Sequence, residues 1–308
     1  MRKPAEHGRT YRTASLFACL LAVRVCTPVG GQSRTDRIRE DVTVLRGIEY
    51  VPNGHDRQRL DLYLPHDPQS RRLPLIVWVH GGGWRSGDKK NCPARRFFGE
   101  GYAVASINYR LSRHAVFPAQ IQDCKAAIRW LRANADERGI DPNRIGVWGS
   151  SAGGHLVALL GTTGAVDEFD VGPNRHVSSR VQAVCDFFGP TDFTRMNRFP
   201  STIDHDAADS PESRLIGGPV QENRDKARRA DPITYVSAEA PPFLIVHGDA
   251  DPLVPHNQSE LLYEALRRAG VDTTFYTVRG GRHGGFRHDP QVDALVEAFF
   301  DKHLSDRP

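Results

Sequence analysis

A serine at the centre of a glycine-flanked pentapeptide is the residue in this chain best placed for nucleophilic chemistry. Residues 149–153 read G-S-S-A-G and put Ser151 in the middle. An apolar run at 145–148 precedes them, and a helix-like run at 155–160 follows. A G-x-S-x-G segment between a strand and a helix forms a sharp turn that exposes the serine hydroxyl, and its glycines avoid clashes with both neighbours. Ser151 is therefore the candidate nucleophile, and Ser150 is interpreted as structural.

A glycine-rich peptide offers backbone donors for the charge that such a nucleophile would create. Residues 80–84 read H-G-G-G-W and follow the continuous apolar run 75–79, which is typical of a strand buried on both faces. Attack on a carbonyl carbon produces an oxyanion, which needs N–H groups aimed at it. We expect these donors to be the N–H groups of Gly82, Gly83 and Ala152. The alternatives are a glycine turn without a ligand, or a phosphate cradle, which the lack of a following G-K-[ST] disfavours.

Two carboxylates at the end of another apolar run could orient a histidine base. The run 243–246 leads into His247 and then into Asp249 and Asp251. Either acid could hold the imidazole while the other caps or braces the loop. We favour Asp251, mainly on the family pattern given below. His247 is interpreted as structural, with its imidazole satisfied by nearby backbone.

A histidine between glycines is the candidate base. His283 stands within G-G-R-H-G-G at 280–285, after the strand-like segment 273–278. A loop beyond the last strand can bring this ring to the serine. The alternative is a surface histidine, one of 13 in the chain, and the neighbouring His288 is interpreted in that way.

Several motifs resemble those of α/β-hydrolase serine esterases of the hormone-sensitive-lipase-like and bacterial feruloyl/acetyl esterase type. The matching segments are 59–65, 80–84, 149–155, 188–192, 247–255 and 281–285. They occur in the order serine, acid, histidine expected of that fold, and the resemblance covers about residues 45–304. It implies that Asp251, the last residue of H-G-x-x-D, is the triad acid. Arg282 departs from the small residue usual before the histidine, and it would either crowd the entrance or contact a substrate.

The elements that must position these loops alternate between strands and helices. Apolar, β-forming runs predict strands near 44–50, 59–64, 74–80, 103–108, 145–149, 182–188, 243–248 and 273–278. Helical spacing of apolar residues predicts helices at 118–133, 152–160, 258–268 and 292–304. We expect an α/β-hydrolase fold, a mostly parallel sheet of about eight strands with helices on both faces and the active loops at the strands' carboxyl ends.

One stretch, residues 191–234, breaks this alternation. It carries several prolines and charge clusters without a sustained period. We interpret it as a small cap inserted over the carboxyl edge of the sheet. The alternative is a solvated surface excursion with no role in binding.

Length and composition are those of one ordinary globular domain. The chain has 308 residues, of which 39% are hydrophobic and 25% charged, with a net charge of +4. This length suits a single α/β-hydrolase domain, which we expect at 32–308. The charge is too mild and too scattered to predict nucleic-acid binding.

The N-terminus has the pattern of a targeting segment. Basic residues precede the apolar run 14–23, and small residues follow at 29–31. This pattern predicts a secretory signal peptide at 1–31, and its apolar run is too short to span a membrane. We expect a secreted or periplasmic protein without stable membrane insertion; the alternative is a cytoplasmic protein with a disordered tail.

The cysteines show no paired framework. Of the five, Cys19 and Cys26 fall in the predicted leader, and Cys92, Cys124 and Cys185 remain. Cys185 lies in an apolar strand and is expected to be a small buried hydrophobe. One disulfide remains open in an exported protein, and no metal-ligand spacing is visible.

The resemblance implies hydrolysis of carboxylic esters, with acetyl or feruloyl groups on carbohydrate as substrates and no cofactor. Trp84, at the end of the glycine-rich peptide, is a candidate substrate contact. A serine peptidase of the oligopeptidase type is the alternative enzyme, because that group shares the fold and the order of the triad. A non-catalytic binding relative is the alternative outside enzymes.

Overall fold

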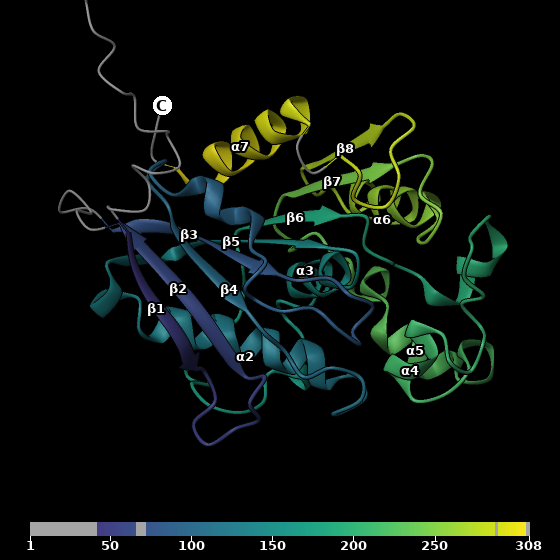
Figure 1. Cartoon of the computed structure of the whole chain (residues 1–308), viewed down its shortest axis with the longest axis horizontal. Helices are drawn as coiled ribbons and strands as arrows, with labels where there is room; N and C mark the ends of the chain where they lie inside the picture. The colour runs from purple at the N-terminus through teal and green to yellow at the C-terminus, as the bar shows by residue number, and fades with distance from the viewer. Residues whose placement is uncertain (1–41, 66–71, 287–288, 306–308) are drawn as a thin grey trace, which may run out of the picture.

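The computed structural model describes residues 42–65, 72–286 and 289–305. The predicted signal peptide, Cys19, Cys26 and His288 lie outside these residues. A single sheet, in the order β1-β2-β4-β3-β5-β6-β7-β8, runs through the molecule (Figure 1). The strands are β1 (Val42–Glu49), β2 (Arg59–Pro65), β3 (Leu73–Val79), β4 (Ala103–Ile107), β5 (Ile140–Ser150), β6 (Ala183–Phe187), β7 (Phe243–Gly248) and β8 (Thr273–Val278).

The pairing directions put the site-bearing loops at one edge of this sheet. β1 and β2 pair antiparallel, as do β2 and β4. Every other pair in the sheet, from β4 with β3 to β7 with β8, is parallel. Because parallel strands end on the same side, the loops after β3, β5, β7 and β8 meet there. The predicted eight-stranded, mostly parallel sheet is confirmed.

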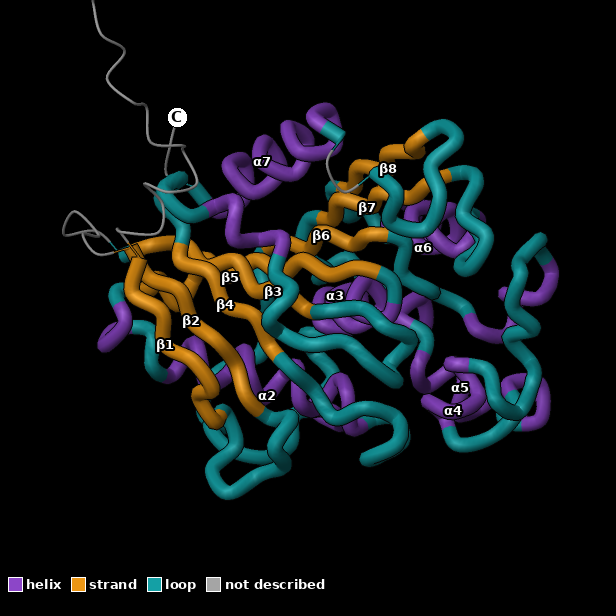
Figure 2. Tube along the Cα trace, viewed as in Figure 1, coloured by secondary structure: helices purple, strands orange, loops and turns teal. Residues whose placement is uncertain are grey.

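Helices cover both faces of the sheet, and the sheet divides the hydrophobic core into two layers (Figure 2). On one side, apolar residues of α2 (Ala119–Ala133), α3 (Ala152–Thr162) and α6 (Asn257–Arg268) pack against the strands. On the other side lie the 3-10 helix η1 (Pro93–Phe97) and α7 (Pro290–Leu304). All seven residues of β3 are buried, as a strand covered on both faces requires.

The segment 191–234 is more ordered than its sequence pattern indicated. It contains η4 (Phe193–Arg198), α4 (Pro211–Ile216), η5 (Val220–Glu222), α5 (Arg224–Ala230) and part of η6 (Pro232–Tyr235). These helices have one or two turns each, which is too short to show a sustained period in the sequence. Local signals do mark α4: the Ser210 hydroxyl accepts from the Ser213 N–H at 3.0 Å, and Gly217 ends the helix with a φ of 79°.

This segment belongs to the hydrophobic core. Its residues Phe193, Met196, Leu215, Val220 and Ala227 are all 0% exposed and join the core layer that contains α3. Figure 1 shows α4 and α5 close to one another, on the far side of α3 from β1. The segment is therefore a packed part of the domain and not a loose surface excursion.

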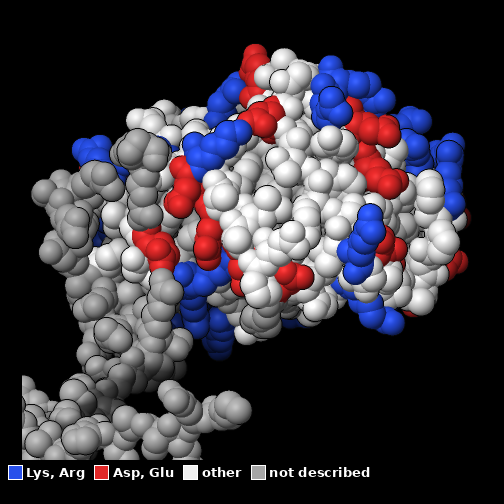
Figure 3. All heavy atoms as spheres, turned by 90° about the horizontal axis from the view of Figure 1, so that it is seen from above, with Lys and Arg blue, Asp and Glu red and all other residues white. Residues whose placement is uncertain are grey.

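The face seen from above in Figure 1 carries acidic and basic side chains interspersed around a largely uncharged centre (Figure 3). Cys92, Cys124 and Cys185 are buried free thiols, so no disulfide forms between described residues. Within the described ranges, no helix has both the length and the apolar character needed to cross a membrane.

Candidate active site

Ser151 occupies a strained turn between β5 and α3. Its backbone has φ 56° and ψ −123°, a conformation that costs free energy for a residue with a side chain. The Ser151 N–H donates to the Phe187 carbonyl at 2.8 Å, which ties the turn to β6. A Cβ on Gly149 would overlap the Gly153 carbonyl, and one on Gly153 would overlap the Val79 carbonyl. The glycines of the motif are therefore required by the close packing of β3, β5 and α3.

The glycine-rich loop after β3 lies directly against this turn. A Cβ on Gly81 would come within 2.6 Å of the Ser150 carbonyl oxygen, so only glycine fits there. Gly82 and Gly83 have φ values of 109° and 56°. No described residue accepts a hydrogen bond from the N–H groups of Gly82, Gly83 or Ala152. The three predicted oxyanion donors thus come from the loop after β3 and the start of α3, and all three residues line the same cavity.

His80 supports this loop, a role that the sequence did not indicate. Arg57 donates to the Nε2 atom of His80 at 2.8 Å, so Nδ1 carries the proton and donates to the Gly81 carbonyl, also at 2.8 Å. The ring stacks on Tyr109 at 4.4 Å between centroids. Burial lowers the pKa of His80 to about 4, so the ring stays neutral and keeps this arrangement at neutral pH.

The structure brings Asp251 to His283. The Nδ1 atom of His283 lies 2.7 Å from Oδ2 of Asp251. The other oxygen, Oδ1, accepts from the N–H groups of Leu253 at 2.8 Å and Val254 at 3.0 Å. Burial alone would raise the pKa of Asp251, but hydrogen bonds from His247 and His283 outweigh it and hold that pKa below its usual range. The carboxylate is therefore ionised and fixed at both oxygens.

The remaining polar residues of these two loops have other positions. Asp249 is exposed and accepts from the Gly280 N–H at 2.6 Å, which braces the loop that carries His283. Arg282 is exposed and does not line the pocket, so neither predicted role for it is seen. His247 contacts the Ser259 hydroxyl and Asp251 as well as backbone, so the prediction of backbone partners alone was incomplete.

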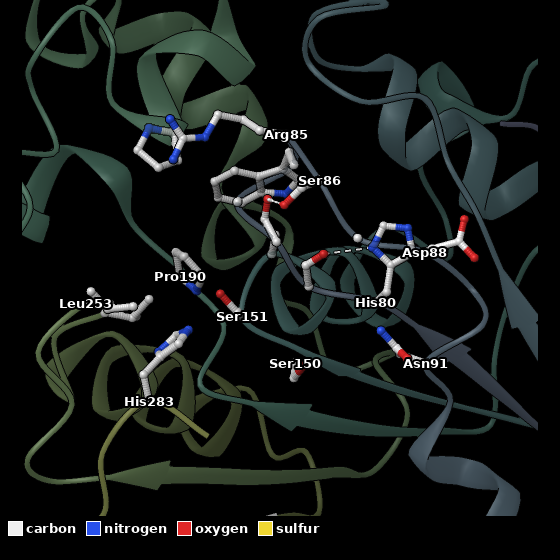
Figure 4. Close-up of a pocket in the computed structure, with 18 of the residues that line it drawn as sticks. His80, Arg85, Ser86, Asp88, Asn91, Ser150, Ser151, Pro190, Leu253 and His283 are labelled. Carbon is white, nitrogen blue, oxygen red and sulfur yellow. Dashed lines mark hydrogen bonds between the residues drawn. The ribbon is translucent and has the colours of Figure 1, made fainter. Parts of the chain in front are cut away.

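A cavity of about 850 Å³ is lined by the glycine-rich loop, the Ser151 turn and His283. Ser151 and His283 both line it, and in Figure 4 the serine hydroxyl and the imidazole point toward one another. The 191–234 segment contributes further lining residues, namely Ile203, His205, Pro211 and Glu212. Polar residues after the glycine-rich loop, among them Ser86, Asp88 and Asn91, line another part of it (Figure 4).

Trp84 borders this cavity but is almost fully buried. Only 1% of it is exposed, and its ring packs edge-on against His155 at 5.0 Å and Phe193 at 5.6 Å between centroids. His155, on α3, also lies 2.8 Å from the Ala230 carbonyl through Nε2. Trp84 therefore acts chiefly as packing between the glycine-rich loop, α3 and the 191–234 segment. The only sign of this role for His155 in the sequence is its place just after the serine motif.

The arrangement has the parts needed for acyl transfer. A serine in a strained turn faces a histidine that is held by a carboxylate, and unpaired N–H groups lie beside the serine. Among the described residues, no group of three or more His, Cys, Asp or Glu side chains is arranged to hold a metal ion.

Comparison with known proteins identifies the family. A family model described as BD-FAE matches residues 60–266. The chain belongs to the BD-FAE family. The predicted resemblance to α/β-hydrolase esterases is thereby confirmed, since the named relatives of this BD-FAE chain are esterases.

Three relatives illustrate the similarity of this BD-FAE chain to known esterases. Esterase LipQ of Mycobacterium tuberculosis is 33% identical over 243 residues, which are 78% of this chain and 56% of that protein. A truncated carbohydrate esterase from gut microbiota is 35% identical with a TM-score of 0.75, covering 84% of this chain and 96% of its own. Esterase B from Lactobacillus rhamnosis is 25% identical with a TM-score of 0.71, covering 88% and 91%. The chain spans little more than half the length of the curated mycobacterial relatives it matches.

Proposed function

We propose that this protein hydrolyses carboxylic esters through Ser151, His283 and Asp251. The observation that carries the proposal is the 2.7 Å contact between His283 and Asp251, beside a serine that faces the same cavity from a strained turn. Relatives named as esterases support the same reaction class.

The geometry suits a two-step reaction. His283 removes the hydroxyl proton as Ser151 attacks the ester carbonyl, while Asp251 holds the imidazole in the required tautomer. The N–H groups of Gly82, Gly83 and Ala152 receive the oxyanion, and each such donor lowers the barrier by roughly 3 kcal/mol. His283 then gives its proton to the departing alcohol as the C–O bond breaks. Water, deprotonated by His283, attacks the acyl-enzyme and releases the acid and the free serine.

We propose acetyl or feruloyl esters of carbohydrate as the substrate class. The carbohydrate esterase from gut microbiota, at 35% identity over most of both chains, supports this choice. The cavity of about 850 Å³ is large for an acetyl group alone, within the range of sites for drug-sized ligands. Export through the 1–31 leader would bring the enzyme to such substrates, and N-terminal sequencing of the mature protein from its native host tests that part.

Loss of the nucleophile is the direct test of the reaction. Ser151→Ala should lower kcat on 4-nitrophenyl acetate by about 10⁴-fold or more, the scale for a triad member. Ser150→Ala is the matched control, since Ser150 is buried beside it. A fluorophosphonate probe should label the wild type at Ser151 and leave Ser151→Ala unlabelled.

Two results would contradict the proposal. Full esterase activity in folded Ser151→Ala would remove the assigned nucleophile. Cleavage of a chromogenic dipeptide in preference to the ester would favour a peptidase. Acetylated xylan and methyl ferulate, assayed side by side, then separate the two acyl groups.

A further inference from the structure

We propose that His247 is a positioning residue that holds the Asp251 carboxylate in place for His283. The inference rests on the proposed function, because Asp251 matters to catalysis only if His283 is the base. It concerns a second histidine on the same carboxylate, one that is not among the residues lining the cavity.

The contacts of His247 define its tautomer. Its Nε2 atom lies 3.3 Å from Oδ2 of Asp251 and 3.1 Å from the carbonyl oxygen of Val254. An ionised carboxylate and a carbonyl only accept, so Nε2 must carry a proton. Its Nδ1 atom lies 2.8 Å from the Ser259 hydroxyl, which therefore donates to it. The acceptors Asp251 and the Val254 carbonyl thus fix His247 as a donor toward Asp251, and the Ser259 hydroxyl, which can donate or accept, adapts to this tautomer.

The surroundings keep this ring neutral. His247 is 0% exposed, and burial, partly offset by its contact with Asp251, lowers its pKa. The titratable groups that face it are Asp251 and His256, the second with its ring centroid 5.3 Å away. His256 is in turn 3.2 Å from Glu260. A neutral ring with one proton can donate from one nitrogen only, and the carboxylate and carbonyl at Nε2 select that nitrogen.

The Asp251 carboxylate consequently has four donors, two at each oxygen. Backbone N–H groups of Leu253 and Val254 hold Oδ1, while His247 and His283 share Oδ2. Without His247 the carboxylate would lose one of the contacts that oppose its rotation. The expected effect is poorer alignment of His283, the base that this carboxylate holds.

Two substitutions of His247 distinguish the loss of its hydrogen bond to Asp251 from the loss of its side-chain volume. His247→Leu fills the space without a donor, whereas His247→Gln places an amide N–H near the position of Nε2. We expect His247→Leu to lower kcat roughly tenfold with KM within about twofold, because misplacement of a catalytic group affects the chemical step. His247→Gln should recover most of the lost kcat, and Ser259→Ala should give a smaller change in the same direction.

The outcomes are distinct. A His247→Leu protein that is less stable but keeps the kcat of the wild type would overturn the proposal and leave His247 structural. If His247→Leu does not fold, Ser259→Ala carries the same test with the same criterion. The downfield proton NMR signal of the His283–Asp251 contact adds a readout that needs no turnover. That signal should shift in the variants even if the wild type proves inactive on esters, and an unchanged signal would count against the proposal.

Discussion

Asp249 and Asp251 stand two positions apart, yet they meet different partners. Asp251 turns inward and takes four hydrogen bonds, including the one from His283. Asp249 turns outward to the Gly280 N–H. The same loop thus uses one acid for the candidate catalytic group and the other to brace the loop that carries His283.

Replacing each of these acids with asparagine tests that division. Asp251→Asn should lower kcat by about 10⁴-fold, because an amide at this position favours the wrong imidazole tautomer. Asp249→Asn keeps an acceptor for the Gly280 N–H and should stay within about threefold of the wild type, as expected for an exposed group. Steady-state kinetics on a nitrophenyl ester distinguish the two. If Asp249→Asn is the more damaging change, the acid has been assigned to the wrong residue.

At the scale of elements, the contact between β3 and α3 depends on glycine. A Cβ on Gly153 would overlap the Val79 carbonyl and come within 2.7 Å of the His80 carbonyl, both of which are backbone and cannot move aside cheaply. We therefore expect Gly153→Ala to destabilise the protein by more than about 3 kcal/mol or to prevent folding. Gly164→Ala is the control, because its Cβ would meet a flexible Arg180 side chain at 3.1 Å. Urea unfolding of both variants measures the difference, and equal stabilities would contradict the packing argument.

The 191–234 segment contributes both to the core and to the cavity. Deleting it would remove buried core residues such as Phe193 and Leu215, so its part in substrate choice is better tested by single substitutions. Ile203 lines the cavity, whereas Phe199 on the same segment is 41% exposed and does not.

Ile203→Ala should change the preference between small and bulky acyl groups. Enlarging the cavity wall alters contacts with remote parts of the substrate, so the ratio of kcat/KM for a feruloyl and an acetyl ester should change by about threefold or more. The rate on 4-nitrophenyl acetate should stay within roughly tenfold. Phe199→Ala should leave the ratio unchanged. An unchanged ratio in Ile203→Ala would make this part of the segment a support for the fold only.

For the molecule as a whole, a carboxyl group buried in the central sheet links stability to pH. Asp186, on β6, is 0% exposed; its Oδ1 accepts from the Gly189 N–H at 3.0 Å, and its Oδ2 has no partner among the described residues. Burial raises the pKa of Asp186 to about 7. In an unfolded chain an aspartate ionises near pH 4. The folded state therefore binds more protons than the unfolded state between these values, and this group's contribution to stability falls as pH rises from about 4 to 7.

Asp186→Asn should remove that dependence. The amide is neutral at every pH, so the variant should gain stability relative to the wild type on going from pH 4.5 to pH 8. Thermal unfolding at both pH values measures the change, and Asp209→Asn, at an exposed position, is the control. A difference between variant and wild type that is constant with pH would show that Asp186 does not titrate in this range.

Local patterns in the sequence determined most of the fold. Runs of β-forming residues and helical spacing predicted all eight strands and the four long helices, because each pattern reflects burial of one short segment. The G-x-S-x-G motif predicted Ser151 at a strand-to-helix turn, because such a turn needs glycine where backbone segments pack closely. Gly149 meets Gly153 within the motif, whereas Gly153 meets Val79 at the end of β3.

Only the tertiary structure decided which residues of distant segments meet. Asp251 and His283 are 32 positions apart, and nothing local to either predicts that one acid faces the ring and the other faces solvent. The burial of Trp84 under the 191–234 segment and the contact of His247 with Asp251 likewise depend on how separate loops pack at the carboxyl edge. Sequence patterns report what each segment buries, whereas hydrogen-bond partners are chosen by packing between segments, and that choice exists only in the folded chain.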